Sequence, residues 1–82
     1  MASPRNRARR AHDDLADRFV ARRHQLGLTQ TELADLAGVS RSSVQAIEGG
    51  KRTIQFDVVS AIAEALGCDL VLTTRSGVAV MP

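Results

Sequence analysis

The stretch over residues 28–51 constrains the fold more than any other, because it holds the start and stop signals of two short helices in succession. Thr29 and Glu32 have the spacing of a capping box, in which the threonine side chain caps the helix and the glutamate reaches back to the backbone of the cap. Gly38 follows where a helix end needs a residue that adopts positive φ, and Ser40 is a second N-cap. These signals predict two helices joined by a tight turn, at residues 29–37 and 41–48.

Both short helices have an apolar face at helical spacing. These faces consist of Leu33, Ala34, Ala37, Val44 and Ile47. Helices that cross at roughly 90–120° across a short turn approach closely, and the small alanines permit this approach. The outer face of the second helix then stays free, and its side chains are small or hydrogen-bonding, as entry into the major groove of DNA requires. The residues of this outer face are Arg41, Ser42, Gln45 and Ala46.

Two further helices are predicted on either side of this pair, over residues 12–26 and 56–66. Each carries an apolar stripe at helical spacing. The stripe residues are Leu15, Phe19 and Leu26 in the first helix, and Phe56, Val59, Ile62, Ala63 and Leu66 in the second. A chain of 82 residues suits one domain with a small core. The predicted fold is therefore mainly α, a compact four-helix bundle that contains the helix-turn-helix within residues 12–68.

The formal net charge of +2 is unevenly distributed along the chain. Residues 1–11 form a basic N-terminal arm whose arginines are Arg5, Arg7, Arg9 and Arg10, and without their charge the remainder of the chain is at −2. If the folded part binds nucleic acid, it must therefore use a local face. The arm is either a solvated tail or a DNA arm that follows phosphates or enters a minor groove. Ser3 and Pro4 also have the pattern of an N-cap and a first helical residue, so the arm could extend the first helix.

Composition argues against several functional classes. The chain has two Phe and no Trp or Tyr, so it lacks the aromatic platforms on which single-stranded nucleic acids stack. One cysteine, Cys68, and two widely spaced histidines give neither an intrachain disulfide nor a metal-site pattern. The sequence shows no catalytic arrangement and no phosphate-cradling glycine loop, so we expect neither an enzyme nor a cofactor. It also shows no signal peptide and no apolar run of membrane-spanning length, and we expect a cytoplasmic protein without a membrane partner.

Residues 28–51 resemble the helix-turn-helix of the Cro and lambda-repressor family, also called the XRE family. The residues that carry the resemblance are Gln30, Leu33, Ala34, Gly38, Val39, Ser40, Val44, Ile47 and Glu48. The likeness continues outward over residues 15–72. It implies a regulator of transcription that binds double-stranded DNA, and more specifically a dimeric repressor. Its two recognition helices would enter successive major grooves of a palindromic operator.

The resemblance also implies roles for individual residues. Base reading falls on Arg41, Ser42 and Ala46, with Gln45 beside them, and phosphate contact or positioning falls on Gln30, Ser40, Ser43, Lys51 and Arg52. Arg41 is also informative on physical grounds, because the helix dipole disfavours a cation in a first turn unless a guanine or a phosphate partners it. The alternative is that the polar residues are ordinary exposed positions and that the two loop cations only keep a surface turn soluble.

A structural ion pair is implied by the same resemblance. In the family, a basic residue near the end of the first helix pairs with an acidic residue near the end of the recognition helix, and here these are Arg23 and Glu48. Such a partly buried pair would fix the angle between the helices. The alternative is two solvated charges that contribute little to stability.

Residues 69–82 depart from the family pattern, in which many members have a fifth helix. The segment is rich in β-branched residues and predicts a strand over 69–74, a turn at 75–77 and a second short strand at 78–80. Because a lone strand or small hairpin is not stable unsupported, we expect it to pair with its copy in a second subunit and form a homodimer. The pairing residues would be Leu70, Val71, Leu72 and Thr73. The alternative is an intrachain hairpin packed on the helix over residues 56–66.

A helix followed by Gly-Cys-Asp-Leu-Val-Leu resembles the HipB-type antitoxins, whose dimers are built from such strands. The partner implied by this resemblance is a HipA-like kinase toxin. Two functional hypotheses follow. The first is a dimeric repressor that binds a palindromic operator and serves as the antitoxin of a toxin–antitoxin operon. The alternative is a protein-binding module whose main role is to neutralise the toxin, with DNA binding secondary.

Overall fold

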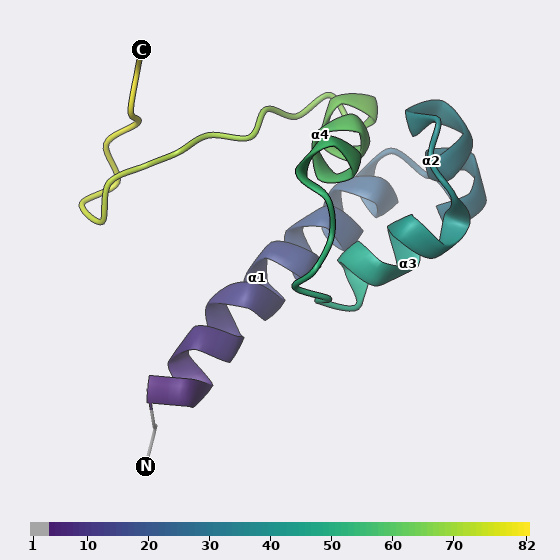
Figure 1. Cartoon of the computed structure of the whole chain (residues 1–82). Coiled ribbons are helices and arrows are strands. Elements are labelled where there is room, and N and C mark those ends of the chain that lie inside the picture. The colour runs from purple at the N-terminus through teal and green to yellow at the C-terminus, as the bar shows by residue number, and fades with distance from the viewer. Residues whose placement is uncertain (1–3) are drawn as a thin grey trace.

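The computed structural model describes the backbone of residues 4–82 and the side chains of residues 14–82. Four α-helices lie in this part of the chain: α1 (Pro4–Gln25), α2 (Gln30–Ala37), α3 (Arg41–Glu48) and α4 (Phe56–Ala65) (Figure 1). The predicted four-helix, mainly α fold is confirmed. Within the described residues no helix combines the length and the apolar character that would let it cross a membrane.

Helix α1 begins at Pro4 and is therefore longer than the helix predicted over residues 12–26. Residues 4–11 continue this helix, as the alternative based on Pro4 predicts, because proline is favourable in a first helical turn. The N-terminal half of α1 projects beyond the other three helices (Figure 1). The side chains of Arg5, Arg7, Arg9 and Arg10 lie outside the side chains that the structure describes, and residues 1–3 lie outside the described residues.

Both ends of α2 and the start of α3 form at the residues that the local sequence signals predict. The Glu32 N–H donates to Thr29 Oγ1 at 3.0 Å, and the Thr29 N–H donates to Glu32 Oε1 at 2.9 Å, which completes the capping box. Hydrogen bonding from the backbone N–H of Thr29, and secondly from its side chain, lowers the pKa of the Glu32 carboxyl. Gly38 closes α2 with a φ of +70°, a conformation that glycine adopts without strain. The Ser40 hydroxyl accepts from the Ser43 N–H at 3.2 Å and caps α3.

The core lies where all four helices meet. Its buried residues are Phe19, Leu33, Ala34, Val44, Ile47, Ile62, Ala63 and Leu66. Three residues of the predicted stripes are instead exposed: Leu15, Leu26 and Phe56. Phe56 is 74% exposed because it is the first residue of α4 and precedes the turns that pack on the other helices. Leu26 follows the last residue of α1, and Leu15 lines an open groove.

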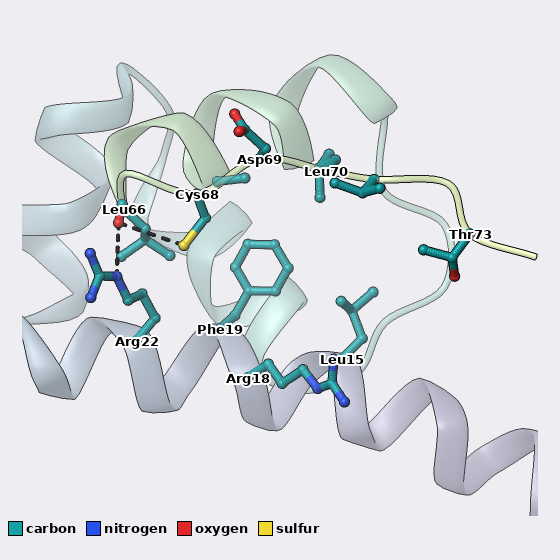
Figure 2. Close-up of a pocket in the computed structure, with 11 residues that line it drawn as sticks. Leu15, Arg18, Phe19, Arg22, Leu66, Cys68, Asp69, Leu70 and Thr73 are labelled. Carbon is teal, nitrogen blue, oxygen red and sulfur yellow. Dashed lines mark hydrogen bonds between the residues drawn. The ribbon is translucent and has the colours of Figure 1, made fainter. Parts of the chain in front are cut away.

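The groove beside Leu15 lies between α1, the end of α4 and the segment that follows α4. It has a volume of about 420 Å³, and its walls combine apolar side chains with charged residues such as Arg18 and Asp69. Leu15 and Phe19 point from α1 towards Leu70 of the C-terminal segment (Figure 2). Arg22 Nε donates to the Leu66 carbonyl at 3.0 Å, which fixes the end of α4 against α1. The C-terminal segment therefore begins at a fixed point on the helical core.

Beyond this point the C-terminal segment, residues 69–82, extends away from the helices (Figure 1). The predicted regular strands are not present in it. One isolated antiparallel bridge joins Thr73 and Ala79, flanked by hydrogen bonds from the Thr74 N–H to the Val78 carbonyl and from the Val80 N–H to the Leu72 carbonyl, both at 2.8 Å. The pairing stops there because neither side of this short hairpin has a neighbouring strand, and two-stranded hairpins are marginal in water.

Candidate nucleic-acid interface

Packing of α2 against α3 presents one side of α3 to solvent. Val44 and Ile47 are buried against Leu33, so the opposite side of α3 faces outward. On that side Arg41, Ser42 and Gln45 are exposed, and Ala46 is half-buried. The structure thus places the four residues predicted to read bases along one face of a helix.

The N-terminal turn of α3 is rich in hydrogen-bonding groups. The Ser40 hydroxyl lies 3.0 Å from the Ser42 hydroxyl and 2.9 Å from the Ser43 hydroxyl, in addition to capping the helix. The first turn holds the cation Arg41 and has no acidic residue. The positive end of the helix dipole and the guanidinium therefore add together, which favours a negatively charged partner at this end of α3.

The predicted pair of Arg23 and Glu48 lies close together across α1 and α3. Arg23 Nε donates to Glu48 Oε2 at 2.6 Å and Arg23 Nη2 donates to Glu48 Oε1 at 3.0 Å. The side chains are 12% and 8% exposed, so the pair is nearly buried. Burial raises the pKa of the Glu48 carboxyl, but the hydrogen bonds from Arg23 and Gln30 and the charges of Arg23 and His24 outweigh it, and the pKa is lowered. Arg23 also donates to the Leu28 carbonyl at 2.8 Å, which ties the loop before α2 to the pair.

Gln30, at the start of α2, is turned towards α3. Its Nε2 donates to Glu48 Oε1 at 3.0 Å, and its Oε1 accepts from Gln45 Nε2 at 3.5 Å. Sequence reasoning predicted Gln30 as a phosphate or positioning residue but missed both of these partners. No local sequence signal identifies them, because Gln30 lies 18 and 15 positions from its two partners.

The loop after α3 carries the two predicted phosphate contacts, Lys51 and Arg52, both exposed. The backbone N–H groups of Gly50 and Lys51 in this loop have partners within α3. The Lys51 N–H donates to the Ala46 carbonyl at 2.9 Å and the Gly50 N–H donates to the Ile47 carbonyl at 3.1 Å. These bonds satisfy the last carbonyls of α3, so both N–H groups already serve as helix termination.

Comparison with known proteins identifies the family. The sequence profile of the helix-turn-helix family HTH_3 matches residues 21–72, and the chain belongs to this family. An uncharacterized HTH-type transcriptional regulator of Methanothermobacter thermautotrophicus is 44% identical over 45 residues, which make up 55% of this chain. The present chain spans 65% of the length of that relative.

Solved structures show the same architecture. A chain described as MDT Protein superposes with a TM-score of 0.71 at 23% identity, over 78% of this chain and 90% of that one, which shows a shared fold. A transcriptional regulator of the HTH_3 family from Vibrio cholerae superposes with a TM-score of 0.62 at 26% identity, over 71% of this chain and 33% of that one. The predicted resemblance to the XRE-type helix-turn-helix family is thereby confirmed.

Proposed function

We propose that this chain is a sequence-specific DNA-binding regulator of transcription that acts in the cytoplasm as a dimeric repressor. The observation that supports this most directly is the exposed face of α3, whose first turn joins a guanidinium to a helix N-terminus with no acidic residue beside it. Family membership points the same way. Binding rather than catalysis is the role that these residues suit.

In this proposal, the exposed side of α3 lies in a major groove. Base edges are read by Arg41, Ser42, Gln45 and Ala46. Arg41 suits a guanine edge, and the methyl group of Ala46 suits a thymine methyl. Phosphates flank the helix on both sides, where the positioning residues are Gln30, Ser40, Ser43, Lys51 and Arg52. Arg23 and Glu48 act structurally, by holding α1 and α3 at a fixed angle.

The basic residues at the start of α1 extend this interface. Arg5, Arg7, Arg9 and Arg10 are proposed to contact DNA phosphates from the projecting end of α1. Because these residues are already helical, binding DNA would cost them less conformational entropy than it would cost a mobile arm. Their contacts would add affinity without sequence preference and would raise the dependence on salt.

The C-terminal segment is proposed to hold two copies together. Its aliphatic side chains are exposed in a single chain: Leu70, Val71, Leu72, Val78, Val80 and Met81. An exposed, nearly uncharged apolar hairpin with free edges is a template for pairing with another strand. Pairing through Leu70, Val71, Leu72 and Thr73 with the same residues of a second copy would complete the ladder and cover these side chains. The two recognition helices would then read half-sites about 34–36 Å apart on a palindromic operator.

A second candidate function is supported by the same segment. Residues 69–82 extend away from the body of the domain, so a different protein could cover the apolar surface while α3 stays free (Figure 1). In that case the chain is an antitoxin whose main role is to bind a HipA-like kinase toxin. The two roles are compatible in one protein, because they use different surfaces.

The test combines sedimentation equilibrium with fluorescence-anisotropy titration against a duplex taken from upstream of the chain's own gene, at two salt concentrations. The repressor proposal expects a dimer that binds this duplex tightly and with a steep salt dependence. A monomer with equal affinity for this duplex and for a scrambled duplex would contradict it. A monomer that acquires DNA affinity only with the product of a neighbouring gene would favour the toxin-binding role.

A further inference from the structure

The groove between α1, the end of α4 and the C-terminal segment has the size and lining of a small-molecule site. Its volume of about 420 Å³ falls within the range of roughly 300–1,000 Å³ that is typical of ligand pockets. All three elements contribute to its apolar walls, through Leu15, Phe19, Leu66, Leu70 and Val71. Leu15 and Phe19 lie on one side of the groove and Leu70 lies on the other (Figure 2). A hydrocarbon chain in the groove would therefore contact apolar side chains on several sides.

These apolar walls are only partly covered by the protein itself. Phe19 is nearly buried, but Leu15, Leu70 and Val71 are each at least 40% exposed. Covering this aliphatic surface is favourable, because it removes apolar area from water. The groove thus favours a ligand whose body is a hydrocarbon.

The charged side chains around the groove favour an anion. Two arginines and one aspartate line it, Arg18, Arg22 and Asp69, so their formal charge is 2 − 1 = +1. The carboxylate of Asp69 points away from Phe19 and Leu15 (Figure 2). Arg18, in contrast, lies about one helical turn from Leu15 on α1. A hydrocarbon ligand with a negatively charged end would therefore meet a cation at the edge of the groove.

Arg18 is the arginine that can bind a ligand most readily. Arg22 already donates from Nε to the Leu66 carbonyl and from Nη1 to the Gln25 side chain. Arg18 is paired with Asp14 at 3.1 Å, and both side chains of this pair are largely exposed. An exposed pair contributes little to stability, so Arg18 can turn to another carboxylate at small cost. Its guanidinium presents several N–H donors in a fork that matches the two oxygens of a carboxylate.

We propose that this groove binds a small aliphatic carboxylate, a molecule with an unbranched hydrocarbon chain and one negatively charged end. The chain would lie between Leu15, Phe19 and Leu70, and Arg18 would hold the carboxylate. The inference does not depend on the proposed DNA-binding function, because none of these residues belongs to the proposed interface with DNA.

One wall of the groove belongs to the segment that is proposed to hold two copies together. Leu70 and Val71 follow the end of α4, which the hydrogen bond from Arg22 to Leu66 fixes against α1. A ligand held between α1 and these two residues would restrict their backbone. Hydrogen exchange of the amides over residues 69–73 should therefore slow when the ligand is bound. Binding in the groove would thus influence the segment through which copies are proposed to pair.

The experiment measures the affinity of the full chain for hexanoate, octanoate and decanoate by isothermal titration calorimetry. Octanol and octylammonium are the matched ligands, because they have the chain length of octanoate but a neutral or a positive end. Alkylation by a maleimide reports where the ligand lies. Cys68 is the single cysteine of the chain, and it is exposed and lines the groove, so an occupied groove should shield its thiol.

Two variants separate the contact with the charged end from the contact with the hydrocarbon chain. Arg18→Met removes the cation and keeps most of the aliphatic stem. Leu15→Asn places a polar amide in the apolar wall. Leu36→Asn is the matched control, because Leu36 is more exposed than Leu15 and lies on α2, outside the groove. Since all three residues are exposed, the variants should fold, and thermal unfolding verifies this.

The affinity should rise with chain length, roughly fourfold for each added methylene that the groove covers. Octanol should bind roughly 5- to 10-fold more weakly than octanoate, and octylammonium more weakly still. Arg18→Met should lower the affinity for octanoate to that for octanol and leave the affinity for octanol unchanged. Leu15→Asn should weaken the binding of every ligand, whereas the control should bind like the unaltered chain. Octanoate should also slow the alkylation of Cys68.

Other results would overturn the inference. Equal affinities for octanoate, octanol and octylammonium would show that the groove does not select a carboxylate. Unchanged octanoate binding by folded Leu15→Asn, or an unprotected Cys68, would mean that the ligand binds outside the groove. An affinity that fell as the protein concentration rose would mean that a second copy covers the groove instead. If no carboxylate bound saturably at millimolar concentration, the proposed site would be refuted, while the proposed DNA-binding function would stand because other residues carry it.

Discussion

Replacing Arg23 with methionine should lower the free energy of unfolding by about 3 kcal/mol, because it removes one partner of a nearly buried ion pair. The substitution deletes two hydrogen bonds to Glu48 and one to the Leu28 carbonyl. The Glu48 carboxylate, only 8% exposed, is then left with the hydrogen bond from Gln30. Methionine keeps most of the aliphatic stem, so lost packing contributes little to the change.

The matched control is Arg18→Met. Arg18 forms an ion pair with Asp14 at 3.1 Å, but its side chain is 77% exposed. Exposed pairs of this kind contribute about 0–1 kcal/mol. Urea unfolding followed by circular dichroism at pH 7 measures both variants, with linear extrapolation to water. For a domain of this size, a loss of about 3 kcal/mol corresponds to a fall in Tm of roughly 12–24 °C. A loss in Arg23→Met no larger than that in Arg18→Met would refute the reasoning.

Lowering the pH should remove the stabilisation that the ion pair of Arg23 and Glu48 provides. The pKa of Glu48 is lowered in the folded chain, so its ionised form stabilises the fold above the unfolded pKa, about 4.3, and this stabilisation disappears as pH falls through the folded pKa. The difference in unfolding free energy between the unaltered chain and Arg23→Met should therefore be largest near neutral pH and should shrink as the pH falls through the acidic range, because protonation of Glu48 removes the ion pair from one protein and the unpaired buried charge from the other. A difference that stayed constant down to pH 2 would mean that the charge of Glu48 contributes nothing.

Three further predictions concern the surfaces. Arg41→Ala should weaken binding to a selected duplex by about 1–3 kcal/mol and relax the base preference at one position. Titration against matched and mismatched duplexes measures both effects. If the ratio of the two affinities were unchanged, Arg41 would not be a base-reading residue. Lys51→Ala should weaken binding equally for all sequences and lower the slope of log affinity against log salt by about 1; an unaltered slope would show no phosphate contact. Deletion of residues 70–82 should convert the dimer into a monomer in sedimentation equilibrium, and a truncated chain that still sediments as a dimer would contradict strand pairing.

The parts of the fold that sequence analysis predicted correctly depend on interactions a few residues apart. The capping box of Thr29 and Glu32 and the reversal at Gly38 are local, so their residue types identify them directly. The apolar stripes identified most of the core for the same reason. Phe56 has the spacing of a core residue but is exposed, because the packing of α4 covers its later turns and not its first residue.

The candidate site shows the same division between local and distant contacts. The family resemblance indicated the pair of Arg23 and Glu48 because two residue types at two fixed positions carry the signal. The bonds of Gln30 to Glu48 and Gln45 have no such signal, since several rotatable side-chain bonds decide where a glutamine amide points. The predicted C-terminal strand is missing for a related reason: β-branched composition favours extended backbone, but a regular strand needs a neighbour.

The exposed C-terminal segment also bears on how long a single copy of the chain survives in a cell. An extended segment with few hydrogen bonds is where proteases cut first. A second copy that covered residues 69–82 would shield them, and the shielded fraction would rise with concentration by mass action. The lifetime of the protein would then depend on its own abundance, so that copies in excess persist while scarce copies are degraded.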